Sequence, residues 1–170
     1  MISFKKIRYK NFLSTGNIPI EVELDKSHTT LIVGSNGSGK STLLDALCYA
    51  LFNKPFRIIK KDQMVNTINN GDTIVEVEFD VGTKKYMIRR GIRPNLFEIY
   101  ENDKLINQDA SSIDYQKYLE QNIMKLNYRS FIQVVILGSS SYEPFMKMKP
   151  RYRREVVEEI LDIRVFGLMD

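Results

Sequence analysis

Hydrophobic and polar residues alternate along several short segments of the chain, and this period of two predicts β-strands. In residues 73–81, for example, valine and phenylalanine side chains alternate with acidic ones. Tight turns separate this segment from the next two, which predicts an antiparallel meander. A further apolar run, rich in β-branched residues, is interpreted as a buried strand that ends before a Gly-Ser stretch. In all, strands are predicted at residues 2–11, 18–24, 29–33, 73–81, 84–92, 96–100 and 131–137.

Other apolar residues recur at intervals of three and four, which is typical of helices. Residues 43–52 carry two such rows, so we expect a helix with a broad apolar face buried against a sheet. Residues 113–124 follow serines that can cap a second helix. A third helix is predicted from Arg151, because Pro150 favours a first helical turn, and its pattern continues to Asp170.

The composition is that of an ordinary soluble globular chain, with 170 residues, 43% hydrophobic and 27% charged. No apolar run approaches the roughly 20 residues that span a bilayer, and the N-terminus lacks the apolar core of a signal peptide. We therefore expect an intracellular protein without membrane contact. The single cysteine, Cys48, and the single histidine, His28, exclude a disulfide framework and a zinc cluster within this sequence. The net charge of +4 is compatible with nucleic-acid contact but does not establish it.

The predicted strand 29–33 leads into Gly34-Ser35-Asn36-Gly37-Ser38-Gly39-Lys40-Ser41, which matches the G-x-x-x-x-G-K-S phosphate-binding loop, or Walker A motif. Glycines let the backbone N–H groups converge on an anion, and the following helix adds its positive end. A chance glycine-rich turn is the alternative, but the order strand, loop and helix favours a nucleotide site. Lys40 is predicted to contact the outer phosphates and Ser41 to ligate magnesium. The predicted nucleotide-binding residues are Ser35, Asn36, Gly37, Ser38, Gly39, Lys40, Ser41 and Thr42.

A complete P-loop enzyme also needs an acidic residue that follows a buried apolar strand. Asp80 ends a predicted strand whose apolar residues alternate with Glu76 and Glu78, so this strand is expected to be half-exposed rather than buried. Asp162 lies on a predicted helix. Neither aspartate therefore fits this role. A second Ser-Gly-Gly stretch that could cover the outer phosphate is missing as well. The sequence therefore predicts half of a site, completed by further sequence, by another chain, or by both.

Beyond the phosphate-binding loop, an ordered set of motifs resembles the N-terminal lobe of the SMC-like ABC ATPases of double-strand-break repair, the SbcC type. Within this family the likeness is strongest to the bacteriophage recombination endonuclease large subunits of the T-even type. The phosphate-binding loop alone is shared by many families, whereas the combination is far more specific. The motifs are residues 9–12 with Ser14, 34–41, 44–46, 55–58, 86–90, 134–138 and 153–161.

This resemblance implies an α/β fold, namely lobe I of an ABC-type head, with a mixed sheet, the antiparallel meander and the root of a coiled coil. Residues 1–150 would form the lobe, and residues 151–170 would begin the coiled coil. The C-terminal half of the same head would supply the signature motif, the acidic strand and the catalytic glutamate, so this chain would be inactive alone. Two heads would dimerise on ATP and magnesium, bind double-stranded DNA and regulate a metal-dependent phosphoesterase nuclease in recombination and repair. A phage-encoded protein would act in the cytoplasm of the infected bacterium.

The resemblance also suggests individual site residues. The family arginine that contacts nucleotide is replaced by Leu13, so the resemblance does not extend to that contact. The family glutamine that touches magnesium and water aligns with Ser139, while Gln133 lies six residues earlier. Asn66 and Thr67 are expected near the base or ribose, with a plain surface loop as the alternative. From their positive charge, the residues considered for DNA contact are Lys54, Arg57, Lys60, Lys61, Arg89, Arg90 and Arg93.

Two other functions are compatible with the phosphate-binding loop. A small P-loop phosphotransferase would need its own acidic strand and an arginine-bearing lid, and the meander interrupts the βαβ pattern such an enzyme would continue. A nucleotide-gated DNA-binding scaffold without turnover is the second alternative. The motif does not distinguish ATP from GTP.

Overall fold

The computed structural model describes residues 2–106, 112–136 and 143–161. The chain forms two compact units, Met1–Tyr115 and Gln116–Asp170. The first contains an antiparallel sheet, one long helix and the phosphate-binding loop, and the second is helical in its described parts. A lobe at residues 1–150 followed by the start of a coiled coil was expected from the resemblance, and this division stays a prediction. Within the described parts of the chain, no helix is long and apolar enough to cross a membrane.

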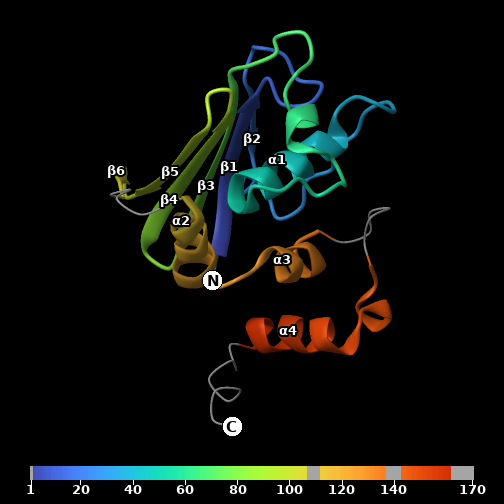
Figure 1. Ribbon diagram of the computed structural model, residues 1–170, viewed down its shortest axis with the longest axis vertical. Coiled ribbons are helices and arrows are strands. Elements are labelled where there is room, and N and C mark those ends of the chain that lie inside the picture. The colour runs from blue at the N-terminus through green and yellow to red at the C-terminus, as the bar shows by residue number, and fades with distance from the viewer. Residues whose placement is uncertain (1, 107–111, 137–142, 162–170) are drawn as a thin grey trace. The chain divides into compact units, whose positions relative to one another are not determined.

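The sheet of the first unit has six strands in the order β2-β1-β3-β4-β5-β6 (Figure 1). All of its pairs are antiparallel, and the predicted meander is present as β3, β4 and β5. Strands β1 and β2 were also predicted, β2 shorter than expected. The strands are β1 (Ile2–Lys10), β2 (Ile20–Glu23), β3 (Thr73–Val81), β4 (Lys84–Ile92), β5 (Leu96–Glu101) and β6 (Lys104–Leu105).

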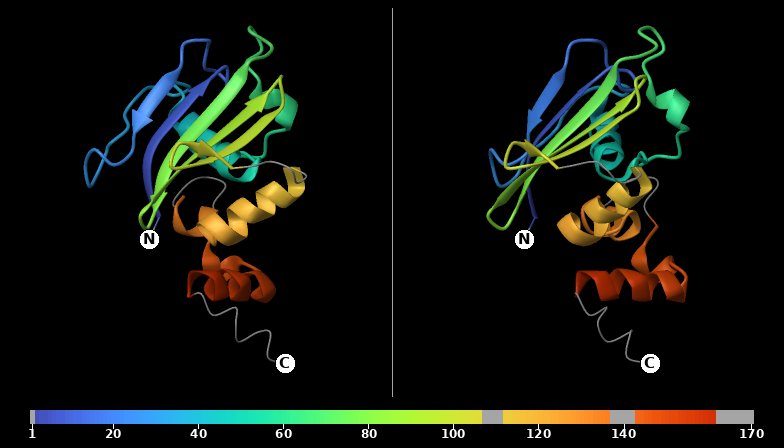
Figure 2. Two further views of the ribbon diagram at one scale, coloured as in Figure 1. Left: turned by 90° about the vertical axis from the view of Figure 1, so that its left-hand side faces the viewer. Right: turned by 60° about the vertical axis from the view of Figure 1, so that its left-hand side comes forward.

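Helix α1 (Lys40–Phe52) covers one face of this sheet (Figure 2). The sheet contains a fully buried cross-strand row of register partners from four adjacent strands, namely Ile7, Val77, Ile88 and Ile99. Burial of these apolar side chains stabilises the packing of the unit. The predicted broad apolar face of the helix is confirmed, since ten of its residues are buried.

The segment 29–33 does not form the predicted strand. Leu31 is 83% exposed and Val33 is 78% exposed, although both are strongly hydrophobic. A strand requires a hydrogen-bonded neighbour, and none of the described strands pairs with this segment. The mixed sheet expected from the sequence would need this segment to be paired.

The predicted helix 113–124 is present, and it runs from α2 (Ser112–Tyr118), within which the boundary between the two units falls, into a π-helical segment (Leu119–Met124). The predicted strand 131–137 is wrong in its described part, because Tyr128–Val134 is helix α3. Asn127 begins this helix by accepting a hydrogen bond from the backbone N–H of Ser130. This cap outweighs the modest β-preference of the branched residues. The predicted C-terminal helix is α4 (Pro150–Ile160), and residues 162–170 lie outside the described residues.

Candidate nucleotide-binding site

The loop between residue 33 and helix α1 depends on three glycines, Gly34, Gly37 and Gly39. Gly37 and Gly39 have φ angles of +84° and +91°, in the left-handed region. A Cβ atom on Gly34 would lie 2.5 Å from Oγ of Ser38, which is closer than such atoms approach. Substitution at these glycines would therefore either strain the turn or fill the space around which the loop folds.

The N-terminus of α1 is open to an anion. Gly39 provides no side-chain cap, and the first turn carries no acidic residue. The N–H groups that begin the helix therefore have no side-chain cap at Gly39, and no acidic residue of the first turn neutralises the positive end of the helix dipole. Together with the glycine loop, this arrangement fits the phosphates of a nucleotide.

Lys40 folds back over the loop, as its Nζ donates to the carbonyl oxygens of Gly34 at 2.6 Å and Ser35 at 2.8 Å. These bonds place the cation beside the anion cradle, where phosphate oxygens can replace the carbonyl acceptors. Ser41 is exposed, so its hydroxyl is accessible to a magnesium ion. Thr42 is 4% exposed, and its N–H already donates to the carbonyl of Gly39, so it contributes mainly to the helix start. The loop and Ser41 thus have the chemistry to hold a magnesium nucleotide.

The segment expected near the base or ribose is anchored by Asn66, which is buried. Its Nδ2 donates to the carbonyl of Leu13, and its Oδ1 accepts from the backbone N–H groups of Ile68 and Asn69. All of these bonds are internal. Thr67, in contrast, is exposed. Of the two residues, only Thr67 has an exposed side chain, while Asn66 positions the loop, and the contact of this segment with a nucleotide stays a prediction.

Asn11, at the end of β1, was not identified as a site residue from the sequence, although it belongs to a motif that carries the family resemblance. It adopts a left-handed φ of +51° and is 1% exposed. Its Nδ2 donates to Oδ1 of Asn17 and to the carbonyl of Asp72, and its Oδ1 accepts from Nδ2 of Asn69. Its backbone carbonyl accepts from the N–H of Asn66 and from the Thr73 hydroxyl. Asn11 therefore ties the turn after β1 to the loop before β3.

Asp45 is a second residue that the sequence did not reveal as important. It is completely buried on α1, one turn beyond Ser41. Its Oδ1 accepts from the backbone N–H of Arg57 and its Oδ2 from Nε of the same residue. The sequence offers two signals: an aspartate within the apolar segment 43–52, and its place in the motif 44–46 that contributes to the family resemblance.

The structure divides the residues considered for DNA contact into two groups. Arg57 is paired with Asp45, Arg89 lies between Glu76 and Glu98, and Arg90 is 4% exposed. The Arg90 guanidinium lies 3.7 Å from the centre of the Phe97 ring, and its Nε donates to the carbonyl of Ala50. Each of these arginines has a partner within the fold, and its contact with DNA stays a prediction. Lys54, Lys60 and Lys61 are exposed, and so is Arg93, which pairs with Asp62.

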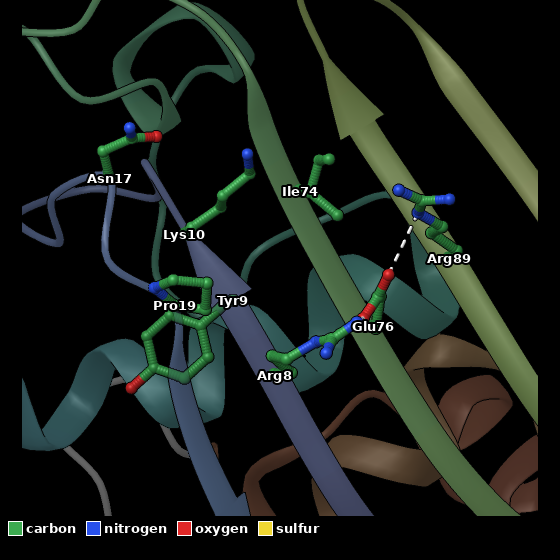
Figure 3. A pocket seen from close by; sticks show the side chains of 8 residues that line it. All are labelled: Arg8, Tyr9, Lys10, Asn17, Pro19, Ile74, Glu76 and Arg89. Atoms are coloured by element: carbon green, nitrogen blue, oxygen red, sulfur yellow. Dashed lines mark hydrogen bonds and ion pairs between the residues drawn. The ribbon is translucent and has the colours of Figure 1, made fainter.

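The sheet face opposite α1 carries a cross-strand row of alternating charges. Arg8, Glu76, Arg89 and Glu98 are register partners on four neighbouring strands. Glu76 lies between the two arginines: its Oε2 accepts from Nε of Arg8 at 2.6 Å, and its Oε1 lies 3.0 Å from Nε of Arg89. The row borders a hollow of about 400 Å³ (Figure 3). The hollow is lined by Arg8, Tyr9, Lys10, Asn17, Pro19, Ile74, Glu76 and Arg89.

Of the two residues considered as equivalents of the family glutamine, Ser139 and Gln133, the structure describes only Gln133. Ser139 lies outside the described residues, as does most of the segment around it. Gln133 lies on α3 rather than in a strand, and its Nε2 donates to the carbonyl of Glu143 at 2.9 Å. Among the described residues, no three histidine, cysteine, aspartate or glutamate side chains gather into a metal site.

The fold and the loop thus define a P-loop nucleotide-binding lobe. The chain belongs to a family described as "AAA domain", whose sequence model matches residues 6–165. Comparison with solved structures agrees at the level of the fold. A chain from a study of ATP-driven dimerisation of SMC ATPases superposes with a TM-score of 0.63 and 21% identity, over 93% of this chain and 99% of that one. An Smc head domain of Pyrococcus furiosus gives a TM-score of 0.66 and 20% identity, over 98% of this chain and 44% of that one. The expected class of head lobe is confirmed.

Similar curated proteins include "Exonuclease subunit 2" of Escherichia phage RB69 and of Enterobacteria phage T4. Each is 44% identical over 172 residues, which cover 100% of this chain and 30% of the relative. The "DNA double-strand break repair Rad50 ATPase" of Thermoplasma volcanium is 30% identical over 166 residues, or 94% of this chain and 18% of that protein. The resemblance inferred from the motifs is confirmed. The chain spans less than a third of the length of these relatives.

Proposed function

We propose that the chain is the N-terminal half of an ATP-binding and ATP-hydrolysing head that regulates a DNA-processing nuclease in recombination and double-strand-break repair. The observation that carries this proposal is the loop 34–41, with its glycine turn, Lys40 and exposed Ser41 in front of an uncapped helix. The names of the phage exonuclease subunits and of the Rad50 ATPases support the nuclease and repair context. ATP and magnesium are the proposed ligands, and the infected host cell is the proposed location.

The C-terminal half of the same head is the first proposed partner. The exposed apolar segment 29–33 and the edge strand β2 supply an unpaired surface in the first unit, on which strands from that half would pair. It would also supply the acidic residue that activates water. Hydrogen exchange tests the pairing: amides 30–33 should exchange slowly in the full-length protein and rapidly in residues 1–170 alone. Equal rates in both would exclude this surface as the contact.

A second head, a metal-dependent phosphoesterase nuclease and double-stranded DNA complete the proposed assembly. Binding of two ATP molecules would favour the closed pair of heads and so switch the nuclease. For DNA we propose Lys54, Lys60 and Lys61, which are exposed and lie close together in the sequence after α1. Replacing all three lysines by alanine should reduce the salt dependence of DNA binding by about two to three units of slope. An unchanged slope would assign DNA contact to another surface.

The decisive test is Lys40→Ala in the full-length protein, with Lys26→Ala as a control on an exposed surface lysine. Loss of the charge-assisted bonds to phosphate should lower the affinity for a fluorescent ATP analogue about tenfold to a hundredfold and abolish turnover. The control should bind normally. Normal nucleotide binding by Lys40→Ala would refute the proposed site, and a wild-type protein that binds nucleotide without hydrolysis would favour the non-catalytic scaffold.

A further inference from the structure

The hollow of about 400 Å³ on the sheet face opposite α1 is built from β1, β3, β4 and the turn that follows β1 (Figure 3). It is therefore distinct from the nucleotide-binding loop 34–41, which precedes α1. Its volume falls within the range of pockets that bind small molecules. The hollow is thus a second concave surface of the first unit, large enough for a ligand of its own.

Positive charge predominates among the side chains that line the hollow. Arg8, Lys10 and Arg89 carry three positive charges, and Glu76 carries the one negative charge among the described lining residues, so the net charge of the lining is +2. Glu76 is buried between the two arginines: its Oε2 accepts from Nε of Arg8, and its Oε1 lies 3.0 Å from Nε of Arg89. The carboxylate therefore fixes the two guanidinium groups but does not neutralise the hollow.

The hydrogen-bonding capacity of Arg89 is not fully used. Its Nε is buried and has no hydrogen-bond partner among the described residues, because its N–H does not point at Oε1 of Glu76 although the two atoms are close. Its Nη1 lies 3.7 Å from Oε2 of Glu98, which is beyond hydrogen-bond distance. Figure 3 shows both terminal nitrogens on the side of the guanidinium away from Glu76. They can therefore donate to an additional anionic acceptor.

Lys10 lies on the other side of the hollow from Arg89. The two residues belong to β1 and β4, and Ile74 of the intervening strand β3 lies between them (Figure 3). Nζ of Lys10 donates to the carboxylate of Asp72, whose side chain is 57% exposed. Solvent screens such a partly exposed ion pair, so a ligand anion can replace Asp72 as the acceptor. Cations from both sides of the hollow are thus available to one bound anion.

The turn after β1 adds one polar and one apolar residue to the lining, Asn17 and Pro19. Oδ1 of Asn17 accepts from Nδ2 of the buried Asn11, which fixes the direction of the amide. Its Nδ2, a group that only donates, is therefore on the side away from Asn11. Pro19 and Ile74 contribute apolar surface. The hollow combines donors for an anion with apolar surface for an organic group, as small-molecule sites usually do.

We propose that this hollow binds a small phosphorylated molecule, whose phosphate group contacts Lys10 and Arg89 and whose organic part lies against Ile74 and Pro19. A phosphate group offers several acceptor oxygens, which match an ammonium and a guanidinium group that approach from two sides. The limited volume favours a small molecule over a nucleic-acid strand, which needs a continuous positively charged groove. This binding does not depend on the proposed function, because it requires no nucleotide at the loop 34–41.

The experiment is a calorimetric titration of the full-length protein with AMP, which carries one phosphate group and an organic part. Lys40→Ala is present throughout, so that the loop 34–41 does not contribute. AMP should bind at one site per chain, and adding Lys10→Gln should weaken this binding about tenfold, because a charge-assisted hydrogen bond is lost. Lys10→Arg should keep most of the affinity. The matched control is Lys6→Gln, since Lys6 lies on the same face of β1 and pairs with Glu21 outside the hollow.

Absence of AMP binding in the Lys40→Ala protein would overturn the proposal, and so would an affinity that Lys10→Gln and Lys6→Gln change equally. Inorganic phosphate should bind more weakly than AMP, because it makes no apolar contact, and equal affinity would overturn the contact with Ile74 and Pro19. Tighter binding of a single-stranded oligonucleotide that also depends on Lys10 would assign the hollow to nucleic acid instead. Melting temperatures of all variants are measured, and a loss of affinity that only follows a loss of folded protein would count against the site.

Discussion

The carboxylate of Asp45 binds Arg57 twice, with Oδ1 on the backbone N–H at 2.9 Å and Oδ2 on Nε at 2.7 Å. Asp45 is fully buried on the helix that follows the phosphate-binding loop, and Arg57 lies on the basic loop after that helix. The pair therefore fixes the path of the basic loop relative to the nucleotide-binding helix. The neighbouring Phe56 is buried and adds an apolar anchor to the same bend.

Replacing Asp45 by alanine should lower the free energy of unfolding by about 2–4 kcal/mol. The substitution leaves the backbone N–H of Arg57 without its acceptor and removes the partner of the guanidinium, whose partial exposure keeps the cost toward the lower end. Urea denaturation of residues 1–170 measures the change. Asp25→Ala is the matched control, because Asp25 forms an exposed pair with Lys5 that solvent screens, so its loss should have little effect. Equal effects of the two substitutions would show that burial gives the Asp45 pair no special importance.

Glu76→Ala should destabilise the sheet by about 1–2 kcal/mol. The change leaves Arg8 and Arg89 close together without the carboxylate that separates them. The control is Glu78→Ala on the same strand, since Glu78 is exposed. In the triple variant that also replaces both arginines by alanine, the penalty should be smaller than the sum of the single changes. Strictly additive penalties would argue against a coupled charge row.

Two substitutions of Asn11 separate its backbone conformation from its hydrogen bonds. Asn11→Gly keeps the φ of +51° accessible but loses three side-chain bonds, and should cost about 1–3 kcal/mol. Asn11→Ala should cost about 1 kcal/mol more, because alanine resists the left-handed region. Thermal unfolding of both variants measures the difference. Identical stabilities would show that the conformation is not strained for a side chain with a Cβ atom.

The elements of the first unit could largely be predicted, because their apolar periodicity reflects which side chains face α1. The prediction of a strand at 29–33 was wrong for a physical reason. The sequence of this segment favours a β-strand, but no described strand pairs with it, and Leu31 and Val33 are exposed. The strand predicted at 131–137 is helix α3 in its described part, because a local cap at Asn127 overrode the β-preference of Ile132 and Val134.

For the candidate site, the spacing of glycines and Lys40 identified the loop without further information. The roles of Asp45, Asn11 and Glu76 could not be predicted in the same way. Each depends on a partner far along the chain, such as Arg89 for Glu76, and residue type alone does not reveal such a pairing. For the same reason the sequence shows the positive charge of Arg57 and Arg90 but not their partners in the fold, which are the Asp45 carboxylate and the Phe97 ring.

The last prediction concerns alkaline pH. Burial on α1 raises the pKa of the Cys48 thiol to about 12, with the Asp45 carboxylate adding to the effect. Burial likewise raises the pKa of Tyr49 to about 12, against a smaller opposing effect of Arg90. In the unfolded chain these groups ionise near 8.5 and near 10, which are about the ordinary values. The unfolded state therefore loses protons first, and the free energy of unfolding should fall as pH rises through this interval.

Below the unfolded pKa of the thiol both states hold its proton, so stability should be level up to about pH 8. Between about pH 8 and pH 10 Cys48 should account for a loss of about 2 kcal/mol, measured by urea denaturation. Cys48→Ala should postpone the decline until Tyr49 begins to ionise, near pH 10. Lysine ion pairs should add to the decline only close to pH 10, because the ordinary lysine pKa is about 10.4 and pairing raises the pKa of Lys5 and Lys6 above its ordinary value in the folded state. The same decline in both proteins would mean that the thiol of Cys48 ionises as readily in the folded state as in the unfolded chain.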